Sequence, residues 1–157
     1  MKNLNDSKLK FIEETGSLIE KKGFSPIASR ILSFLLIADT EEKNFYEIQE
    51  SLNASKSAVS NGIGFLLDKN FIRANTNPGD RKRYFRLNIE LWIELLKSIT
   101  EEYKGYRGAI DRALDLRSDK FTESNSQLAK IRDLYQLFEE KLPVILSEWE
   151  TKNSIKA

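Results

Sequence analysis

The fold of this chain is decided by the stretch Asn53-Ala54-Ser55-Lys56-Ser57-Ala58-Val59-Ser60-Asn61 and by a second stretch, Asn77-Pro78-Gly79-Asp80-Arg81-Lys82-Arg83-Tyr84. The first predicts a helix that begins after an N-cap serine, and the second predicts a turn between two strands. Seven lysines and arginines but only two aspartates lie between residues 53 and 86, although the whole chain has a formal net charge of +1. Positive charge gathered beside small polar side chains predicts a nucleic-acid-binding surface.

The segments next to this helix predict a winged helix-turn-helix. A short helix at 45–52 is expected to begin with a capping box, in which Asn44 and Glu47 each satisfy a backbone donor of the other. The tight connection Asn53-Ala54 then leads to the second helix at 56–69, which Val59 and Ile63 help to bury. Strands are expected at 71–76 and 83–87, and residues 39–43 are expected to form a loop.

The rest of the chain predicts long helices with apolar stripes. One should run from about Asn5 to Lys22, with Leu4 at the start of its stripe, and a core helix should follow Ser25-Pro26. Beyond Ile89 the stripe continues for roughly 28 residues, about 42 Å of helix. A last stripe runs from Leu128 to Trp149, and Pro143 within it predicts a kink or a restart. These stripes exceed what a small core can cover, so we expect a second copy of the chain to cover them.

The expected fold class is therefore mainly α with a small β-wing. Residues 1–24 form an N-terminal dimerisation helix, residues 25–88 the winged helix-turn-helix DNA-binding domain, and residues 89–157 a C-terminal helical dimerisation region.

The composition argues against catalysis and against a metal or cofactor site. The chain has no histidine and no cysteine, which removes the commonest general base, thiolate nucleophile and metal ligands. Its carboxylates occur as neighbours such as Glu13-Glu14, which point about 100° apart on a helix and do not converge. Neither a secretory leader nor a membrane-spanning run is present in the sequence, so we expect a cytoplasmic protein.

Eight residues are candidates for DNA contact. On the second helix, Ser57 and Asn61 should point away from the buried face and Ser60 should lie at its flank, where each can bond to base edges. Ser55, Lys56 and the first helical amides suit phosphates. In the wing, the candidates are Arg81, Lys82 and Arg83, whose long cations can enter a narrow minor groove.

Each of these assignments has a plainer alternative. Ser55 would only cap its helix, the other helical residues would be solvated surface, and the wing cations would only protect an exposed strand edge. Asp80 is expected to orient the wing through an ion pair with Arg81.

Aromatic residues suggest two roles, of which core packing is favoured. A pocket for a cationic effector could form from five of them. They are Phe24, Trp92, Tyr103, Tyr106 and Tyr135. Their helical spacing favours the dimer core instead, so no ligand site is assigned and any effector is unknown.

Taken together, these motifs resemble the MarR-like winged-helix transcription regulators, and within them the branch of the glycine betaine synthesis regulators. The resemblance covers about residues 16–87 and rests on the order and spacing of short motifs. These are Gly23-Phe24-Ser25-Pro26 with Arg30-Ile31, Glu47-Ile48 with Leu52, Ser55-Lys56-Ser57-Ala58-Val59-Ser60, and Gly79-Asp80-Arg81-Lys82 with Tyr84. It implies a homodimer that presents two recognition helices and two wings to a pseudo-palindromic operator.

The chain departs from that family pattern within the recognition helix. Gly64 stands where relatives often carry a basic residue, and Phe65 stands where they often carry an acidic one. The expected function is sequence-specific binding of a double-stranded DNA operator by a homodimeric transcription regulator, more specifically a repressor. The alternative is a winged-helix module that binds other proteins and has no specific DNA binding.

Overall fold

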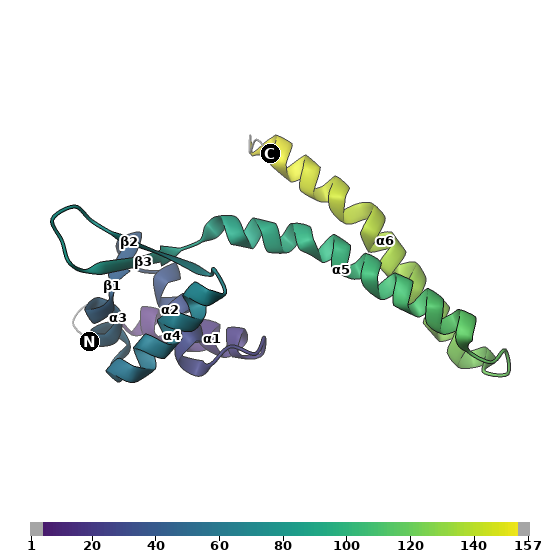
Figure 1. Cartoon of the computed structure of the whole chain (residues 1–157), viewed down its shortest axis with the longest axis horizontal. Helices are drawn as coiled ribbons and strands as arrows, with labels where there is room; N and C mark the ends of the chain where they lie inside the picture. The colour runs from purple at the N-terminus through teal and green to yellow at the C-terminus, as the bar shows by residue number, and fades with distance from the viewer. Residues whose placement is uncertain (1–4, 154–157) are drawn as a thin grey trace. The chain divides into compact units, whose positions relative to one another are not determined.

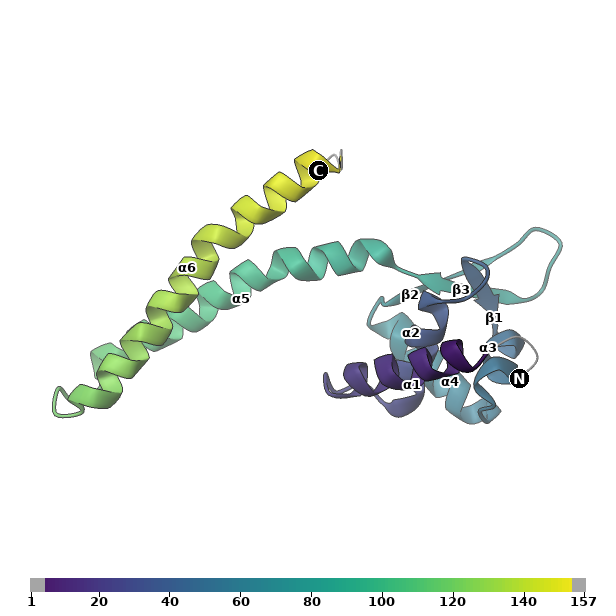
Figure 2. The same ribbon diagram turned by 180° about the vertical axis from the view of Figure 1, so that it is seen from behind.

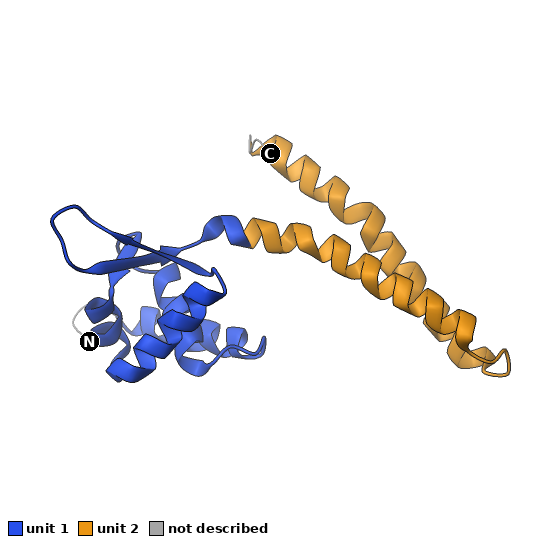
Figure 3. Cartoon of the chain, in the orientation of Figure 1, with its two compact units in different colours: residues 1–91 blue, residues 92–157 orange. Residues whose placement is uncertain are grey.

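The computed structural model describes residues 5–153, and these fold into two compact units divided between Leu91 and Trp92 (Figure 3). Residues 1–4 and 154–157, which include Leu4 of the first predicted stripe, lie outside the described residues. Each unit is described by itself.

The first unit holds the helices and strands of a winged helix-turn-helix (Figures 1 and 2). In chain order these are α1 (Asp6–Glu20), α2 (Pro26–Leu36), β1 (Glu42–Asn44), α3 (Phe45–Leu52), α4 (Lys56–Asp68), β2 (Ile72–Thr76) and β3 (Arg83–Leu87). Helix α5 (Ile89–Leu116) begins directly after β3. The predicted fold class, mainly α with a small β-wing, is confirmed.

The helices of this unit begin where local sequence signals predict. Ser25 and Ser55 cap α2 and α4 by accepting hydrogen bonds from backbone amides three residues later. Asn44 and Glu47 form the predicted capping box at α3. Asn70 follows α4 with a φ of 58°, the left-handed conformation that asparagine tolerates.

Helix α2 is the centre of the core, as predicted. It is surrounded by apolar side chains from the other helices and from the sheet, which are Ile12, Ile48, Val59, Ile63, Leu66, Ile72 and Phe85. Two buried serines within α2 donate their hydroxyls to carbonyls four residues earlier, so no buried hydroxyl of the helix is left unpaired. This core fixes the orientation of α4 and of the sheet, which carry the candidate site.

The two glycines of α4 have different surroundings. A Cβ added at Gly62 would lie 2.7 Å from Cδ1 of Ile31, because α4 crosses α2 closely at this point. A Cβ added at Gly64 would meet nothing within 4 Å. The close approach that glycine permits is therefore between two helices at Gly62, whereas Gly64 lies on the exposed face.

The sheet has three antiparallel strands in the order β1-β3-β2. The sequence predicts β2 and β3 but misses β1, which lies where a loop was expected. That interpretation was wrong because β1 has only three residues, all polar, and its pairing partner β3 comes some forty residues later. In this sheet β3 is central, with Ile72 and Phe85 facing the core.

The second unit is an antiparallel pair of long helices, the rest of α5 and α6 (Thr122–Lys152). Tyr103 packs against Tyr135 and Phe138, and Arg107 donates to a Glu139 carboxylate oxygen at 2.8 Å. Pro143 lies within α6, which continues to Lys152 without the restart considered from the sequence.

Neither α5 nor α6 contains a buried residue. Large apolar side chains remain exposed along both, among them Trp92, Leu95, Leu96, Ile131, Leu134, Leu137, Ile145 and Trp149. Within residues 5–153, no helix combines the length and hydropathy needed to cross a membrane.

Candidate nucleic-acid interface

The exposed face of α4 carries the polar residues that the sequence predicts for it. Lys56, Ser57, Ser60 and Asn61 are all exposed, and Gly64 continues the same face one turn later. The Ser55 hydroxyl accepts from the amide of Ala58 at 3.2 Å and lies 3.2 Å from the Ser57 hydroxyl. Capping therefore occupies the Ser55 side chain, while Ser60 and Asn61 make no side-chain hydrogen bond within the described chain.

The wing is a hairpin of β2 and β3 joined by residues 77–82. The backbone N–H of Asp80 donates to the carbonyl oxygen of Asn77 at 3.0 Å, closing a turn in which Pro78 and Gly79 are the central residues. Gly79 has a φ of 82°, which the third position of a type II turn requires and which glycine adopts without strain.

Asp80 organises the residues after this turn, although not by the predicted ion pair. Its carboxylate accepts hydrogen bonds from the backbone N–H of Lys82 at 2.9 Å and from the Tyr84 hydroxyl at 2.7 Å. Among the described residues it forms no ion pair with Arg81. The expectation of an ion pair was wrong because the turn directs backbone and phenol donors at the carboxylate.

These hydrogen bonds also shift the pKa values of Asp80 and Tyr84. The Lys82 amide and then the Tyr84 hydroxyl lower the pKa of Asp80 below its ordinary value, since both stabilise the carboxylate. The same contact raises the pKa of Tyr84, because ionising the phenol would place two negative charges side by side. Both groups therefore keep the hydrogen bond across the neutral pH range.

A second carboxylate, Glu42 of β1, holds the opposite side of the wing. Its two oxygens accept from the side-chain amides of Asn75 and Asn77, at 2.9 and 3.1 Å. Asn77 and then Asn75 lower the pKa of Glu42, and the charge of Arg86 lowers it further.

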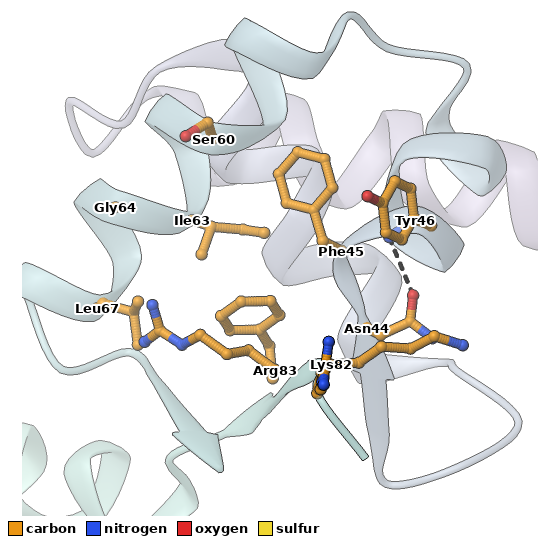
Figure 4. A pocket seen from close by; sticks show the side chains of 11 residues that line it. Asn44, Phe45, Tyr46, Ser60, Ile63, Gly64, Leu67, Lys82 and Arg83 are labelled. Atoms are coloured by element: carbon orange, nitrogen blue, oxygen red, sulfur yellow. Dashed lines mark hydrogen bonds between the residues drawn. The ribbon is translucent and has the colours of Figure 1, made fainter. Parts of the chain in front are cut away.

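An open cleft of about 560 Å³ lies between α4 and the wing (Figure 4). Ser60, Ile63, Gly64 and Leu67 line its α4 side, and residues 44–46 line the side at the start of α3. The wing side is lined by Arg81, Lys82, Arg83 and Phe85. In Figure 4 the Arg83 side chain extends toward Leu67, and its guanidinium carbon lies 5.6 Å from the centroid of the Phe85 ring.

The cleft brings together four of the eight predicted DNA-contact residues, which are Ser60, Arg81, Lys82 and Arg83. Ser55, Lys56, Ser57 and Asn61 do not line it and lie along the exposed helix. Within the described part of the chain, Lys56 and the three wing cations form no ion pair. Their charge therefore remains available to an anionic partner.

Two parts of this surface are missed by the sequence interpretation. Tyr46 at the start of α3 is 64% exposed and lines the cleft. Glu42 braces the wing only because β1 pairs with β3. Tyr46 could have been found from the sequence, as an exposed aromatic residue in the first turn of a predicted helix. Glu42 could not, because no pattern in the neighbouring residues predicts its contacts.

The aromatic residues considered for an effector pocket do not act as one group. Phe24 packs edge-on against Phe65 and Phe71 in the first unit. Tyr103 and Tyr106 each pack against Tyr135 in the second unit. These contacts are apolar packing within each unit.

Comparisons of the sequence and of the structure find similarity to transcriptional regulators. Residues 90–152 match the family described as MmpR5-like MarR family transcriptional regulator. The chain is 26% identical over 131 residues to the HTH-type transcriptional regulator MmpR5 of Mycobacterium tuberculosis (strain ATCC 25618 / H37Rv), covering 83% of this chain and 79% of that protein. A crystal structure of a transcriptional regulator superposes with a TM-score of 0.64 and 24% identity, over 92% of this chain and 99% of that one.

The chain is similar in sequence to MarR family transcriptional regulators and has a winged-helix fold. The family match lies in α5 and α6, whereas the structural match extends over both units. The sequence similarity to MmpR5 covers 83% of the chain, and the structural similarity supports the fold of both units.

Proposed function

We propose that this MarR-like chain is a sequence-specific regulator of transcription that binds double-stranded DNA. The observation that carries the proposal is the set of unpaired wing cations beside the exposed polar face of α4. The cations suit phosphates or a narrow minor groove, and Ser57, Ser60 and Asn61 present groups that can bond to base edges. The similarity to MmpR5, a transcriptional regulator by name, supports the same conclusion.

The regulator acts as a homodimer. Support comes from α5 and α6, which carry long apolar stripes but bury no residue within one chain. A second copy of the chain can bury these apolar stripes, because the two-fold axis of a homodimer brings identical surfaces together. Two recognition helices related in this way should fit half-sites about 34–36 Å apart, one turn of the duplex.

The proposal also includes the sign of regulation, the cellular location and the branch of the family. A dimer bound at a promoter can regulate by occluding it, so we propose a cytoplasmic repressor. The branch of the glycine betaine synthesis regulators remains a prediction that rests on the motifs of residues 16–87.

The test is DNA binding by the full chain, using genomic fragments selected for binding and random duplex DNA. Arg81→Ala should weaken both in similar proportion and reduce the salt dependence by about one unit of slope, because a backbone or minor-groove cation is largely blind to sequence. Asn61→Ala should cost about 1–3 kcal/mol on the selected site and little on random DNA. Lys10→Ala is the matched control, since it removes an exposed cation from α1.

Two results would argue against this function. If Arg81→Ala left both affinities and the salt slope equal to those of Lys10→Ala, the wing would not contact DNA. A wild-type chain without salt-dependent DNA binding would favour the alternative, a winged-helix module that binds other proteins. Footprinting adds a geometric check, because protection of a single half-site contradicts the dimer.

A further inference from the structure

We infer that Glu42 is a positioning residue for the wing, tying β1 to β2 and to the wing turn so that the cations at 81–83 are held in place for DNA. The inference rests on the proposed function for its consequence, but its structural part stands on the hydrogen bonds of Glu42 alone. Glu42 itself need not touch DNA.

The sheet register shows how far this contact reaches. β1 and β2 are the two edge strands, with β3 between them. Glu42 lies opposite Arg86 of β3, and Asn75 lies opposite Tyr84. Neighbouring strands are about 4.8 Å apart, so the Glu42 contacts cross about 10 Å of the outer face of the sheet. They fasten one edge of the sheet to the other.

From Asn77 the hydrogen bonds continue to the cations. The side chain of Asn77 donates to Glu42, and its carbonyl oxygen accepts from the backbone N–H of Asp80. The Asp80 carboxylate in turn accepts from the backbone N–H of Lys82 and from the Tyr84 hydroxyl. An unbroken series of hydrogen bonds thus joins β1 to the backbone of the basic segment.

This series matters because the outer wing has no apolar core. Residues 73–79 and 81–83 are all exposed, and Asp80 is only partly buried. A two-stranded ribbon in water is marginally stable by itself. The pairing of β2 with β3 ends at Thr76 and Arg83, and beyond it the hydrogen bonds of Glu42 and Asp80 restrain the wing turn. Such restraint lowers the entropy lost on binding.

Charge and position predict opposite effects at Glu42, which makes the inference testable. Glu42 is an anion close to a cationic surface, so on charge alone its removal should strengthen DNA binding. If it positions the wing, its removal should weaken binding despite the gain in positive charge.

The experiment compares Glu42→Gln with Glu41→Gln in the full chain. Glutamine retains the size of the side chain but replaces one carboxylate oxygen by an NH₂ donor. Because Asn75 and Asn77 donate to different oxygens of Glu42, one of the two hydrogen bonds is lost. Glu41 is the matched control, because it is exposed and makes no side-chain hydrogen bond or ion pair within the described chain. Binding to random duplex DNA is measured by fluorescence anisotropy over a series of salt concentrations, and amide hydrogen exchange of residues 76–84 is measured without DNA.

Glu42→Gln should weaken binding about three- to tenfold, the fold-change that corresponds to one ordinary net hydrogen bond. It should also speed exchange at the amides of Asp80 and Lys82. Glu41→Gln should bind as the wild type does or slightly more tightly, with unchanged exchange. Asn77→Ala, which alters no charge, should weaken binding in the same direction and add little in the Glu42→Gln background.

Equal or tighter binding by Glu42→Gln together with unchanged exchange would overturn the inference. So would full additivity of Glu42→Gln and Asn77→Ala. If the wild type bound no DNA, the proposed function would fail, and exchange in the Glu42→Gln and Glu41→Gln variants would still decide whether Glu42 holds the wing.

Discussion

Alanine at Gly64 should stabilise the chain and alanine at Gly62 should not, although only Ile63 separates the two positions in α4. Glycine costs a helix interior roughly 1 kcal/mol relative to alanine, so the propensity gain is about the same at both. Gly64 is exposed and its added Cβ would meet nothing within 4 Å. Gly64→Ala should therefore stabilise the chain by about 1 kcal/mol.

At Gly62 the same methyl group meets helix α2. The added Cβ would lie 2.7 Å from Cδ1 of Ile31, 3.3 Å from Cγ2 of Ile27 and 3.4 Å from the backbone nitrogen of Ala28. Carbon atoms ordinarily approach to about 3.5–4.0 Å, and Ile31 is fully buried, so it has no free space to move into. Overpacking of this kind costs about 1–3 kcal/mol, which cancels or exceeds the propensity gain.

The difference between the two variants removes the propensity effect and isolates the packing cost, about 1–3 kcal/mol. Urea unfolding followed by circular dichroism at matched protein concentration gives this difference. Hydrogen exchange of the α2 and α4 amides shows whether the difference in stability arises where these helices cross. Tryptophan fluorescence cannot show this, because Trp92 and Trp149 both lie in the second unit. Equal stabilisation by both substitutions would refute the close crossing of α2 and α4.

Three further predictions concern other parts of the chain. Light scattering should give about twice the chain mass of 18.1 kDa, and Ile145→Asp in the exposed stripe of α6 should shift the chain toward monomer, whereas Lys141→Asp should not. Asn44→Ala should destabilise the chain by about 1 kcal/mol in urea unfolding, through loss of the capping box. The Lys82 amide chemical shift should stay constant from neutral pH through the range in which ordinary carboxyl groups titrate and change only at lower pH, because the pKa values of Asp80 and Glu42 are lowered. A shift already complete at pH 6 would contradict this assignment.

The sign of the pH effect follows from the lowered pKa values. A carboxyl whose pKa is lower in the folded chain contributes stability above its unfolded pKa, and that contribution disappears as the pH falls through the folded value. Acid should therefore loosen the wing, and neutral pH should not. Asp80→Asn should remove much of this dependence, because the asparagine side chain does not titrate in this range.

The sequence by itself determined the features that depend on residues a few positions apart. Ser25 and Ser55 cap their helices, Asn44 and Glu47 form a box, and the turn at Gly79 adopts a positive φ. Each of these is an interaction across two to four residues, which a short fragment already contains. The polar, exposed face of α4 was equally predictable, because helical periodicity separates it from Val59 and Ile63.

Only the tertiary structure decided the contacts that join distant segments. Glu42 accepts hydrogen bonds from Asn75 and Asn77, which lie 33 and 35 residues later in the sequence. No sequence pattern near Glu42 predicts a strand there. Asp80 lies beside Arg81 in the sequence, yet the turn directs its carboxylate to Lys82 and Tyr84 instead. Gly62 and Gly64 look alike in a sequence, and the crossing of α2 over α4 makes one a close contact and the other open surface. Such contacts depend on strand register and helix crossing, which the packing of the whole unit determines and no single segment encodes.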